Sequence, residues 1–575
     1  MPRRTSRYMS ILALLGMFIF IIYRLHRRII ALVFRLRQPQ HRVSVQRGLR
    51  VPMSDGVQLT ADHYSPRRPG SYPTILIRSP YGRHYQDSLF GITMMFVAHR
   101  FAERGYNVIV QDVRGRFGSG GKFLPYINEK ADGLATIEWL KRQPWFDGRV
   151  GMWGASYLGL VQWALSTDAP EVKALVPIVT GANPYTILFP DGAFDLGLAV
   201  RWLSILHDLQ DTRDKPLWRR LGMWANIERR VQPAFDTVPI IESDREAVGQ
   251  PVEFYRLWLA HTRQDDEMWR AFLKHNDISR TRAQAHLIGG WYDFFLRALL
   301  QDYETLRARG HQPYLTIGMW NHFEMTLNDV DLREGLAWCD AHLKNRHSAL
   351  RSDTVRVYVM GARRWRGMSS WPPPANETAF YLTGAGGLGD APPMNSVAPS
   401  RYRYDPNDPT PAFAGAIFSP TLAGRRDNRR MEARDDVLTF TTPPLDSPLE
   451  IIGYVRAHLY VASSRCSADF FVRLCDVYPD GASYNVCDGL FRLLPDAERD
   501  ADGIARVTVD MWATAHEFRR GHRIRVQVSS GAHPRWLRNS GTDQPFPQAI
   551  TFEPADQTIY HDAAHPSALI LPVYT

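Results

Sequence analysis

The sequence predicts an α/β domain with an inserted helical cap, followed by a second, all-β domain of the jelly-roll type. With 575 residues the chain is too long for one ordinary hydrophobic core. Between about residues 45 and 330, short apolar runs alternate with helical stretches, which is typical of an α/β domain. After about residue 350, strands of period two appear between turn-rich connections. We therefore expect two folded domains, 41–350 and 351–575.

Apolar runs bounded by Gly, Pro or Asp predict the strands of the first domain. Between two of them, Gly133–Arg142 (GLATIEWLKR) predicts a helix. Short buried strands that alternate with helices indicate a mostly parallel sheet covered on both faces. The predicted strands are Tyr72–Ile77, Tyr106–Val110, Val150–Trp153, Leu175–Val179, Ala285–Ile288 and Tyr314–Ile317.

A Trp-rich segment without strand character, about residues 186–280, interrupts this alternation and predicts a helical cap. In the second domain, apolar and polar residues alternate in His522–Val528, Ala457–Val461 and Val507–Val509. Asp-Gly turns at 480–481 and 502–503 separate such strands. These features are typical of a β-sandwich.

The net charge of +10 belongs to the N-terminus rather than to the folded body. Residues 1–40 contain eight Arg, no Lys and no acidic residue, which leaves 61 basic and 59 acidic residues in the rest of the chain. A nucleic-acid-binding surface requires a basic stripe on a folded domain. We therefore expect no nucleic-acid partner.

An uncharged apolar run, Met9–Tyr23, lies within this basic N-terminal segment. As a helix it would be about 22 Å long, shorter than the roughly 30 Å hydrocarbon core of a bilayer. No small-residue cleavage site of a signal peptide follows it. We expect residues 1–40 to associate with a membrane, either as a short signal anchor or as a basic helix lying in the interface. The side of the membrane and the oligomeric state stay open.

The four cysteines show neither CxxC spacing nor a neighbouring paired His, which argues against a zinc site. They are too few for a disulfide framework in a chain of this size. We expect free, mostly buried thiols, which leave the redox compartment open. The cysteines are Cys339, Cys466, Cys475 and Cys487.

Ser156 lies where a predicted strand meets a helical run, in the string VGMWGASYLG. A sharp strand-to-helix turn between small residues raises a serine hydroxyl above a sheet, as in a nucleophile elbow. The usual second glycine would stand two residues after the serine, but Leu158 is there and Gly159 follows. A tight turn with an incidental serine explains the local string equally well.

Asp293 and His322 complete a candidate catalytic set with Ser156. A serine nucleophile needs a base, and the base needs an orienting acid. In parallel-sheet hydrolases the acid and then the histidine follow the serine, each on a loop after a later strand. Asp293 follows the strand at 285–288 and His322 follows the strand at 314–317. Asp293 alone could equally be a helix N-cap, but the order of all three residues predicts a Ser156–Asp293–His322 triad.

A tetrahedral intermediate also needs hydrogen-bond donors for its oxyanion. The backbone N–H of Tyr157, next to the serine, is one candidate. The phenolic hydroxyl of Tyr81, in the early loop Arg78–Gly82, is a second candidate. A turn aromatic that packs under the cap is the alternative interpretation of Tyr81.

The glycine-rich string Gln111–Lys122 (QDVRGRFGSGGK) suggests a phosphate-binding loop, but its spacing fails. Arg116 stands where such a loop requires Gly, and Phe123 replaces the metal-binding hydroxyl. We expect instead a loop at a strand end, with an ion pair between Asp112 and Arg114.

Ten ordered strings between about residue 50 and the C-terminus resemble the CocE/NonD hydrolases, the group that contains bacterial cocaine esterase, α-amino acid ester hydrolases and X-Pro dipeptidyl-peptidases. The histidine loop departs from the family's GPWSH and reads GMWNH here. The N-terminal segment lies outside the matched region. The strings are MSDGVQLTADHY, SPYGR, QDVRGRFGSGG, QPWFDGRVGMWGASYLG, GGWYDFF, GMWNH, VMGARRW, RYRYDPNDP, DVYPDG and GHRIRVQVSSG.

This resemblance implies an α/β-hydrolase core, a helical cap and a C-terminal jelly roll, without a metal or an organic cofactor. It implies Ser156 as nucleophile, Asp293 as acid and His322 as base. It implies an oxyanion hole formed by Tyr81 and the Tyr157 amide. The expected function is a serine hydrolase of small-molecule esters, or amides. Two alternatives remain: an X-Pro dipeptidyl-peptidase, and a non-catalytic membrane-tethered binding protein.

Overall fold

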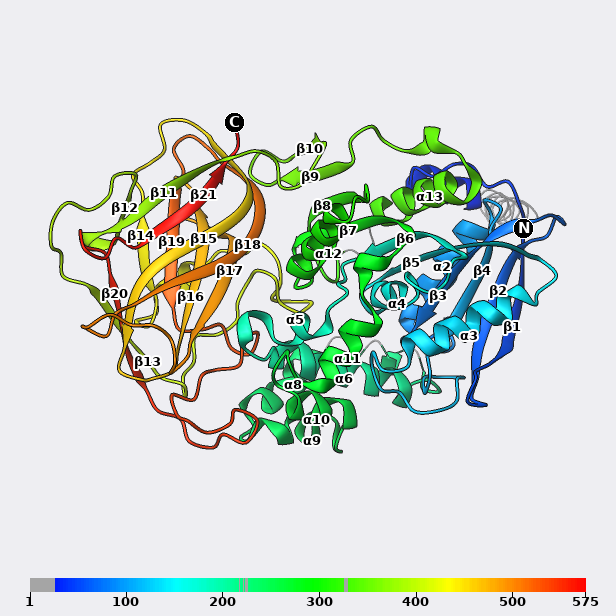
Figure 1. Cartoon of the computed structure of the whole chain (residues 1–575), viewed down its shortest axis with the longest axis horizontal. Helices are drawn as coiled ribbons and strands as arrows, with labels where there is room; N and C mark the ends of the chain where they lie inside the picture. The colour runs from blue at the N-terminus through cyan, green and yellow to red at the C-terminus, as the bar shows by residue number, and fades with distance from the viewer. Residues whose placement is uncertain (1–25, 217, 221, 223–225, 325–328) are drawn as a thin grey trace, which may run out of the picture.

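A computed structural model describes residues 26–575, apart from 217, 221, 223–225 and 325–328. Figure 1 shows an α/β domain and an all-β domain side by side, with a group of helices below the α/β sheet and between the two domains. The predicted fold class is confirmed. The expected membrane-associated run, Met9–Tyr23, lies outside the described residues. Within the described part of the chain, no helix combines the length and the apolar character needed to cross a bilayer.

A ten-stranded sheet forms the core of the first domain, in the order β1-β2-β4-β3-β5-β6-β7-β8-β9-β10. Strands β3 to β9 run parallel, whereas β1, β2 and β10 are antiparallel to their neighbours. Because β9 pairs with β8, this sheet continues past residue 350. The strands are β1 (Val43–Pro52), β2 (Gln58–Pro66), β3 (Tyr72–Ser79), β4 (Asn107–Asp112), β5 (Phe146–Ala155), β6 (Val172–Ile178), β7 (Gln284–Tyr292), β8 (Tyr314–Asn321), β9 (Val355–Val359) and β10 (Arg364–Met368).

Helices cover both faces of this sheet (Figure 1), which explains why strands such as β4 are buried at every residue. Helix α13 approaches β5 closely, because a Cβ on Gly151 would lie 2.8 Å from the Leu343 side chain. The five principal helices of this domain are α2 (Leu89–Ala102), α3 (Glu129–Lys141), α4 (Tyr157–Leu165), α12 (Leu296–Ala308) and α13 (Asp329–Lys344).

Every described element between β6 and β7 is helical, as predicted for the cap. Trp202 and Trp258 are buried within it, so the tryptophan-rich composition of this segment supplies the cap's own core. The cap elements are α5 (Pro184–Leu188), η1 (Pro190–Gly192), α6 (Leu196–Asp211), α8 (Ile227–Asp236), η2 (Ile240–Glu242), α9 (Ser243–Val248), α10 (Glu253–Ala260), α11 (Glu267–His275) and η3 (Ile278–Arg280).

The second domain contains an 11-stranded sheet system in which β15 is the longest strand. Buried and half-exposed residues alternate along β15 from Val455 to Val461, which is the period-two pattern of a strand with one covered face. The strands are β11 (Asn376–Thr383), β12 (Gly387–Gly389), β13 (Ser400–Tyr404), β14 (Leu438–Thr441), β15 (Leu449–Ser463), β16 (Ala468–Val477), β17 (Ser483–Leu493), β18 (Ala505–Phe518), β19 (Arg523–Ser529), β20 (Ala555–Tyr560) and β21 (Ala568–Val573).

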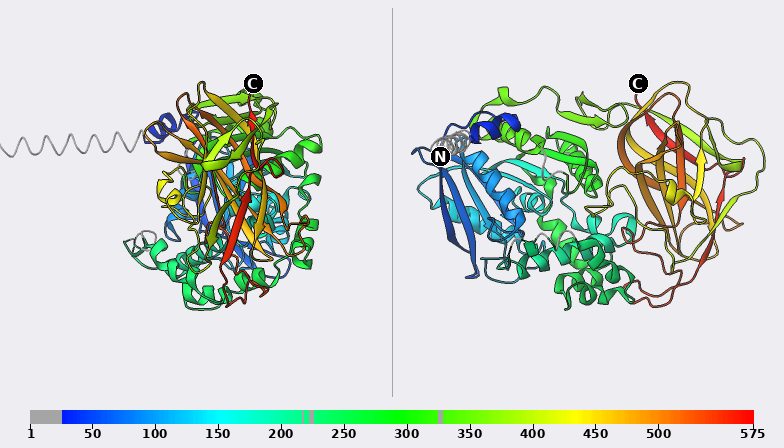
Figure 2. Two further views of the ribbon diagram at one scale, coloured as in Figure 1. Left: turned by 90° about the vertical axis from the view of Figure 1, so that its left-hand side faces the viewer. Right: turned by 180° about the vertical axis from the view of Figure 1, so that it is seen from behind.

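Residues 26–33 form a helical segment that lies against the first domain near α13, as both Figure 1 and the rear view in Figure 2 show. Ala31 of this segment is fully buried. Arg27 Nε donates to Glu103 Oε1 at 2.7 Å, and Arg37 pairs with Asp340 of α13. These contacts fix the position of the segment on the folded body.

Candidate active site

Ser156 lies in a strained turn between β5 and α4, with φ 59° and ψ −126°. A non-glycine residue rarely adopts this conformation, and such outliers are concentrated at functional sites. A Cβ on Gly154 would lie 2.4 Å from Leu158 Cβ, and one on Gly159 would lie 2.4 Å from Thr180 Cγ2. Gly154 therefore lets Leu158 of α4 approach the turn, and Gly159, one position later than usual, lets α4 pack against Thr180 after β6. The conformation favours the nucleophile elbow over an incidental turn.

His322 and Asp293 form a hydrogen bond of 2.6 Å between Nδ1 and Oδ2. The other oxygen of Asp293 accepts from the backbone N–H of Phe295 at 2.8 Å. Phe295, rather than Asp293, is the N-cap of α12, so the aspartate orients the imidazole without capping the helix. Because Nδ1 faces the carboxylate, Nε2 is the nitrogen left for a partner in the cavity.

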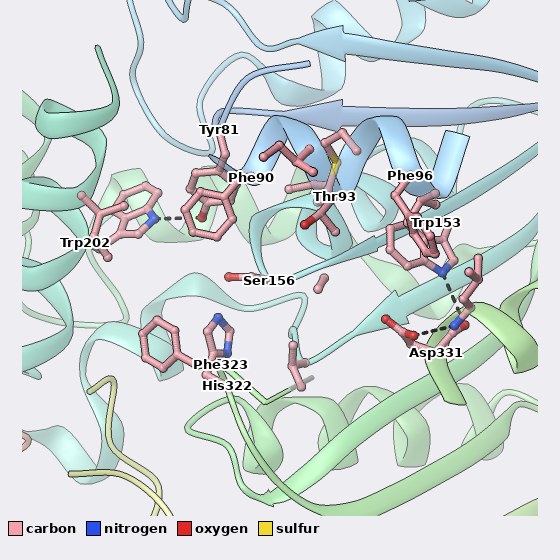
Figure 3. Close-up of a pocket in the computed structure, with 18 of the residues that line it drawn as sticks. Tyr81, Phe90, Thr93, Phe96, Trp153, Ser156, Trp202, His322, Phe323 and Asp331 are labelled. Atoms are coloured by element: carbon pink, nitrogen blue, oxygen red, sulfur yellow. Dashed lines mark hydrogen bonds between the residues drawn. The ribbon is translucent and has the colours of Figure 1, made fainter. Parts of the chain in front are cut away.

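The Ser156 side chain lies in a cavity between Tyr81 and His322 (Figure 3). The cavity has a volume of about 320 Å³ and is lined by all three of these residues. The loops after β3, β5 and β8 thus meet at the carboxyl edge of the parallel sheet, where ligands of such sheets bind. The predicted set of distant residues is brought together in one place.

Tyr81 directs its hydroxyl toward the reacting end of the cavity, where the indole N–H of Trp202 donates to it at 3.0 Å. Ser79 fixes the loop by accepting from the Tyr81 backbone N–H at 3.0 Å. Burial raises the pKa of Tyr81, an effect that hydrogen bonds with Trp202 and Ser156 partly offset. The phenol therefore stays protonated at neutral pH and retains an O–H that can donate to an oxyanion.

Tyr157 is the first residue of α4, so its backbone N–H has no acceptor within the helix. Its side chain is buried, and its hydroxyl donates to Glu129 Oε1 at 2.6 Å. The backbone N–H of Tyr126 donates to the same hydroxyl at 3.3 Å. These bonds fix the start of α4, where an amide donor for an oxyanion is needed.

Phenylalanine rings surround the His322 imidazole. The ring centroids of Phe294, Phe295 and Phe418 lie 4.7, 5.5 and 5.4 Å from it, respectively. Phe418 comes from the second domain, from a loop between β13 and β14. Sequence reasoning missed it because a single aromatic residue in a loop carries no local signal of the cavity it reaches.

The ion pair predicted between Asp112 and Arg114 is wrong. Asp112 accepts from Arg83 Nε at 2.6 Å, whereas Arg114 pairs with Asp132 and Asp55. Neighbouring residues of a strand-end loop point in different directions, so sequence adjacency did not give the partner. Since Arg83 follows Tyr81 by two residues, the Arg83–Asp112 pair ties the tyrosine loop to β4.

Arg116 of the same glycine-rich loop connects the Tyr81 loop to the cap through hydrogen bonds. Its Nε donates to the Pro80 carbonyl at 3.0 Å and its Nη2 donates to the Leu206 carbonyl of the cap at 2.8 Å. Burial lowers the pKa of Arg116 to about 10, so the guanidinium stays charged at neutral pH. The glycine-rich string Gln111–Lys122 therefore holds the Tyr81 loop in place through the hydrogen bonds of Arg116.

The far end of the cavity is apolar except for one carboxyl group, that of Asp331 near the start of α13 (Figure 3). Asp331 is 6% exposed and accepts from the Leu332 backbone N–H at 2.6 Å. Burial raises its pKa to about 8. Among the described residues, no basic side chain forms an ion pair with it. Sequence reasoning missed Asp331, because an aspartate in the first turn of a helix is an ordinary feature.

The described residues contain no group of three or more His, Cys, Asp or Glu side chains that could hold a metal ion. All four cysteines are free; Cys339 and Cys475 are buried, Cys487 is half-buried and Cys466 is exposed.

Comparisons with known proteins place this chain in a family. The S15 family of X-Pro dipeptidyl-peptidases matches residues 55–324, and the X-Pro dipeptidyl-peptidase C-terminal non-catalytic domain matches residues 348–570. A CocE/NonD family hydrolase from Staphylococcus aureus has the same fold, with a TM-score of 0.66, 17% identity and coverage of 92% of this chain and 94% of that one. Cocaine esterase from Rhodococcus sp. is 32% identical over 571 residues, which cover 92% of this chain and 98% of that protein. This chain belongs to the CocE/NonD hydrolase family.

Other solved structures share the whole CocE/NonD fold with this chain. An α-amino acid ester hydrolase aligns with a TM-score of 0.74 at 22% identity, covering 93% of this chain and 97% of that one. An aminopeptidase from a Thaumarchaeota archaeon aligns with a TM-score of 0.77 at 23% identity and the same coverage. Because cocaine esterase is 32% identical over almost its whole length and the S15 family matches residues 55–324, this chain is an enzyme, a serine hydrolase, and the alternative of a non-catalytic binding protein is set aside.

Proposed function

We propose that this enzyme hydrolyses carboxylic esters through an acyl-enzyme, with Ser156 as nucleophile, His322 as base and Asp293 as orienting acid. The Asp293–His322 hydrogen bond of 2.6 Å, beside a serine held in a strained turn, is the observation that supports this most strongly. The Tyr81 hydroxyl and the Tyr157 amide are proposed as the two oxyanion donors. The side-chain roles follow the general logic of a Ser-His-Asp triad.

In the first half-reaction, Ser156 Oγ forms a bond to the carbonyl carbon while His322 Nε2 takes the hydroxyl proton. The tetrahedral intermediate collapses, the bond to the alkoxy oxygen breaks, and the imidazolium gives its proton to the departing alcohol. In the second half-reaction, water attacks the acyl group and His322 accepts its proton. That proton returns to Ser156 as the carboxylic acid leaves. Asp293 stays ionised and stabilises the imidazolium.

The lining of the cavity supports esters of apolar compounds over X-Pro peptides. A dipeptidyl-peptidase must hold the free amine of its substrate close to the scissile bond, and an ammonium group requires an acceptor or a counter-charge there. Asp331 is the one carboxyl group in the described cavity lining, and it lies at the far end. Around Ser156 the walls are mostly aromatic, including Trp202 and Phe418.

Covalent labelling tests the nucleophile directly. A fluorophosphonate probe is expected to label the wild-type enzyme and not Ser156→Ala, which should also lose at least about 10⁴-fold in kcat for an aryl acetate. Ser166→Ala is the matched control, because Ser166 is the residue that caps the other end of α4 and its hydroxyl donates to the Trp163 carbonyl at 3.0 Å. Labelling of Ser156→Ala at wild-type level would refute the assignment. Faster turnover of X-Pro anilides than of aryl esters would favour the peptidase.

We also propose membrane association through the N-terminal segment, residues 1–40. Support comes from the uncharged run Met9–Tyr23, from the eight arginines around it and from exposed apolar residues in the helical segment 26–33. In vesicle flotation, the full chain is expected to float with phosphatidylglycerol-containing vesicles. A chain that lacks residues 1–25 is expected to float less. Equal recovery of both chains in the non-floating fraction would contradict the proposal.

A further inference from the structure

One arm of the catalytic cavity leads away from Ser156 along α2 and the start of α13. Figure 3 places Phe96, Trp153 and Asp331 at its far end, on the opposite side of Ser156 from Trp202. Apart from Thr93 and Asp331, the side chains along this arm are apolar. They include Phe34, Phe90, Ile92, Met94, Phe96, Val97, Trp153 and Leu332.

This arm reaches the protein surface along α2, beside the N-terminal segment. Ile92 lines the cavity and is also 50% exposed, so the mouth lies beside it. Phe34, which directly follows the helical residues 26–33, lines the cavity as well. Its ring lies 5.2 Å from the ring of Phe96. The N-terminal segment is therefore part of the wall of the catalytic cavity.

The outer surface of the same segment is apolar where a soluble protein surface would be polar. Ile29, Leu32 and Val33 are 44%, 70% and 69% exposed, and their i, i+3, i+4 spacing places them on one face of the helix. Arg28 and Arg35 are exposed beside them. An apolar helix face flanked by arginines fits the boundary between acyl chains and anionic headgroups.

We propose that this arm binds a long linear hydrocarbon chain of the ester substrate, and that the chain enters from an anionic lipid surface contacted by Ile29, Leu32, Val33 and Ile92. The proposal deepens the proposed esterase function and depends on it. An apolar arm whose mouth lies beside exposed apolar residues gives a hydrocarbon chain a path that avoids water.

The low charge of the residues that line the arm is compatible with a bound hydrocarbon chain. Asp331 is the one carboxyl group among the described lining residues, and burial raises its pKa to about 8, so it is mostly protonated at neutral pH. Outside the cavity, Arg27 and Arg37 are paired with Glu103 and Asp340 and hold the segment in place. These contacts leave the apolar face directed away from the body of the protein.

Chain-length series test the arm. Two sets of esters are compared below their aggregation concentrations: p-nitrophenyl acetate, butyrate, octanoate and dodecanoate, and methyl, butyl, octyl and dodecyl benzoate. In one of the two sets, kcat/KM is expected to rise about two- to fourfold per added methylene until the arm is filled. The set in which kcat/KM rises shows whether the arm binds the acyl part or the alcohol part of the ester. A flat or falling profile in both sets would overturn the inference, and absence of acetate hydrolysis would instead reject the esterase proposal.

Thr93→Trp places a large ring in the arm at a residue outside the proposed triad and oxyanion hole. It is expected to reduce kcat/KM for the preferred long ester at least about tenfold while acetate hydrolysis stays within about twofold. Thr93→Leu is a milder variant that keeps the test valid if the tryptophan prevents folding. It should lower kcat/KM only for the longest substrates. Equal losses for acetate and long esters in a folded variant would contradict the assignment.

Vesicle-borne substrate tests the entry route in the full chain. Turnover of a dodecyl or dodecanoate ester in phosphatidylglycerol-containing vesicles is compared with turnover of dissolved acetate. The variant Ile29→Ser/Leu32→Ser/Val33→Ser is expected to lose at least about fivefold on the vesicle-borne ester and nothing on acetate. The matched control, Met394→Ser/Ile550→Ser, removes equally exposed apolar residues from the second domain, where they are 83% and 64% exposed. Equal behaviour of the two variants would overturn entry from a lipid surface.

Discussion

The two ends of the catalytic cavity each contain a buried carboxyl group, but the two groups differ in their hydrogen-bond donors. At the reacting end, Asp293 accepts hydrogen bonds from the His322 imidazole and from the Phe295 backbone, so both of its oxygens have donors. At the far end, the Leu332 backbone N–H donates to Asp331, no basic side chain among the described residues pairs with it, and burial raises its pKa to about 8. Burial alone therefore does not distinguish the proposed orienting acid from another buried carboxyl group. The hydrogen-bond donors arranged around the carboxylate distinguish it.

The largest expected effect tests the acid at the reacting end. Asp293→Asn should lower kcat for aryl acetate by about 10⁴-fold, because an asparagine amide favours the wrong tautomer of the histidine. Asp331→Asn is the matched control and should keep kcat within about threefold. Steady-state kinetics of both variants measure this contrast. If both aspartates behaved alike, the distinction between the two ends of the cavity would fail.

A second prediction concerns the donor opposite the histidine. Tyr81→Phe keeps the ring and removes the hydroxyl, so kcat should fall by about 10²- to 10³-fold with little change in KM. Tyr185→Phe removes a hydroxyl that donates to the Thr262 carbonyl within the cap and should leave kcat unchanged. Separate determination of kcat and KM distinguishes the outcomes. A rise in KM at constant kcat would make Tyr81 a packing residue.

A smaller effect is expected for the wall that the second domain contributes. Phe418→Ala should lower kcat/KM for a benzoate ester roughly tenfold, mainly through KM, because apolar contact with the substrate and with His322 is lost. Phe440→Ala, which is buried in β14 outside the cavity lining, should lower stability without changing KM. An unchanged KM in Phe418→Ala would show that the second domain takes no part in substrate binding.

The smallest effect on activity, and a distinct effect on stability, is expected at Asp331. An acid whose pKa is raised in the folded state stabilises the fold fully below its unfolded pKa, and this contribution is lost as pH rises through the folded pKa of about 8. Relative to the wild type, Asp331→Asn should therefore gain up to about 4 kcal/mol in free energy of unfolding between pH about 5 and about 9. Urea denaturation at both pH values measures it. A pH-independent difference would indicate an ionised Asp331.

Much of the fold could be predicted from the sequence because its signals are local. Short apolar runs gave β3 to β8 to within a few residues, and the absence of strand pattern gave the cap. Candidate triad residues could also be selected from the sequence, because chain order and position after a strand are one-dimensional features. These features selected Asp293 and His322.

The rest depended on contacts that a sequence does not encode locally. The partner of Asp112 is Arg83, 29 positions away, rather than the nearby Arg114. Phe418 reaches the cavity from the second domain, and Asp331 looks like an ordinary residue of a first helical turn. The continuation of the first sheet into β9 and β10 was missed too, because their period-two pattern resembles that of the domain that follows.

The position of Phe418 makes the two domains one functional unit. Its ring packs against the imidazole of the other domain, and nearby the Tyr292 hydroxyl donates to the Asn485 carbonyl at 2.9 Å. A cut in the connection between β10 and β11 followed by dissociation would leave the histidine beside water instead of an aromatic ring. Hydrolytic activity can thus serve as a reporter of whether the halves of a nicked molecule still adhere to each other.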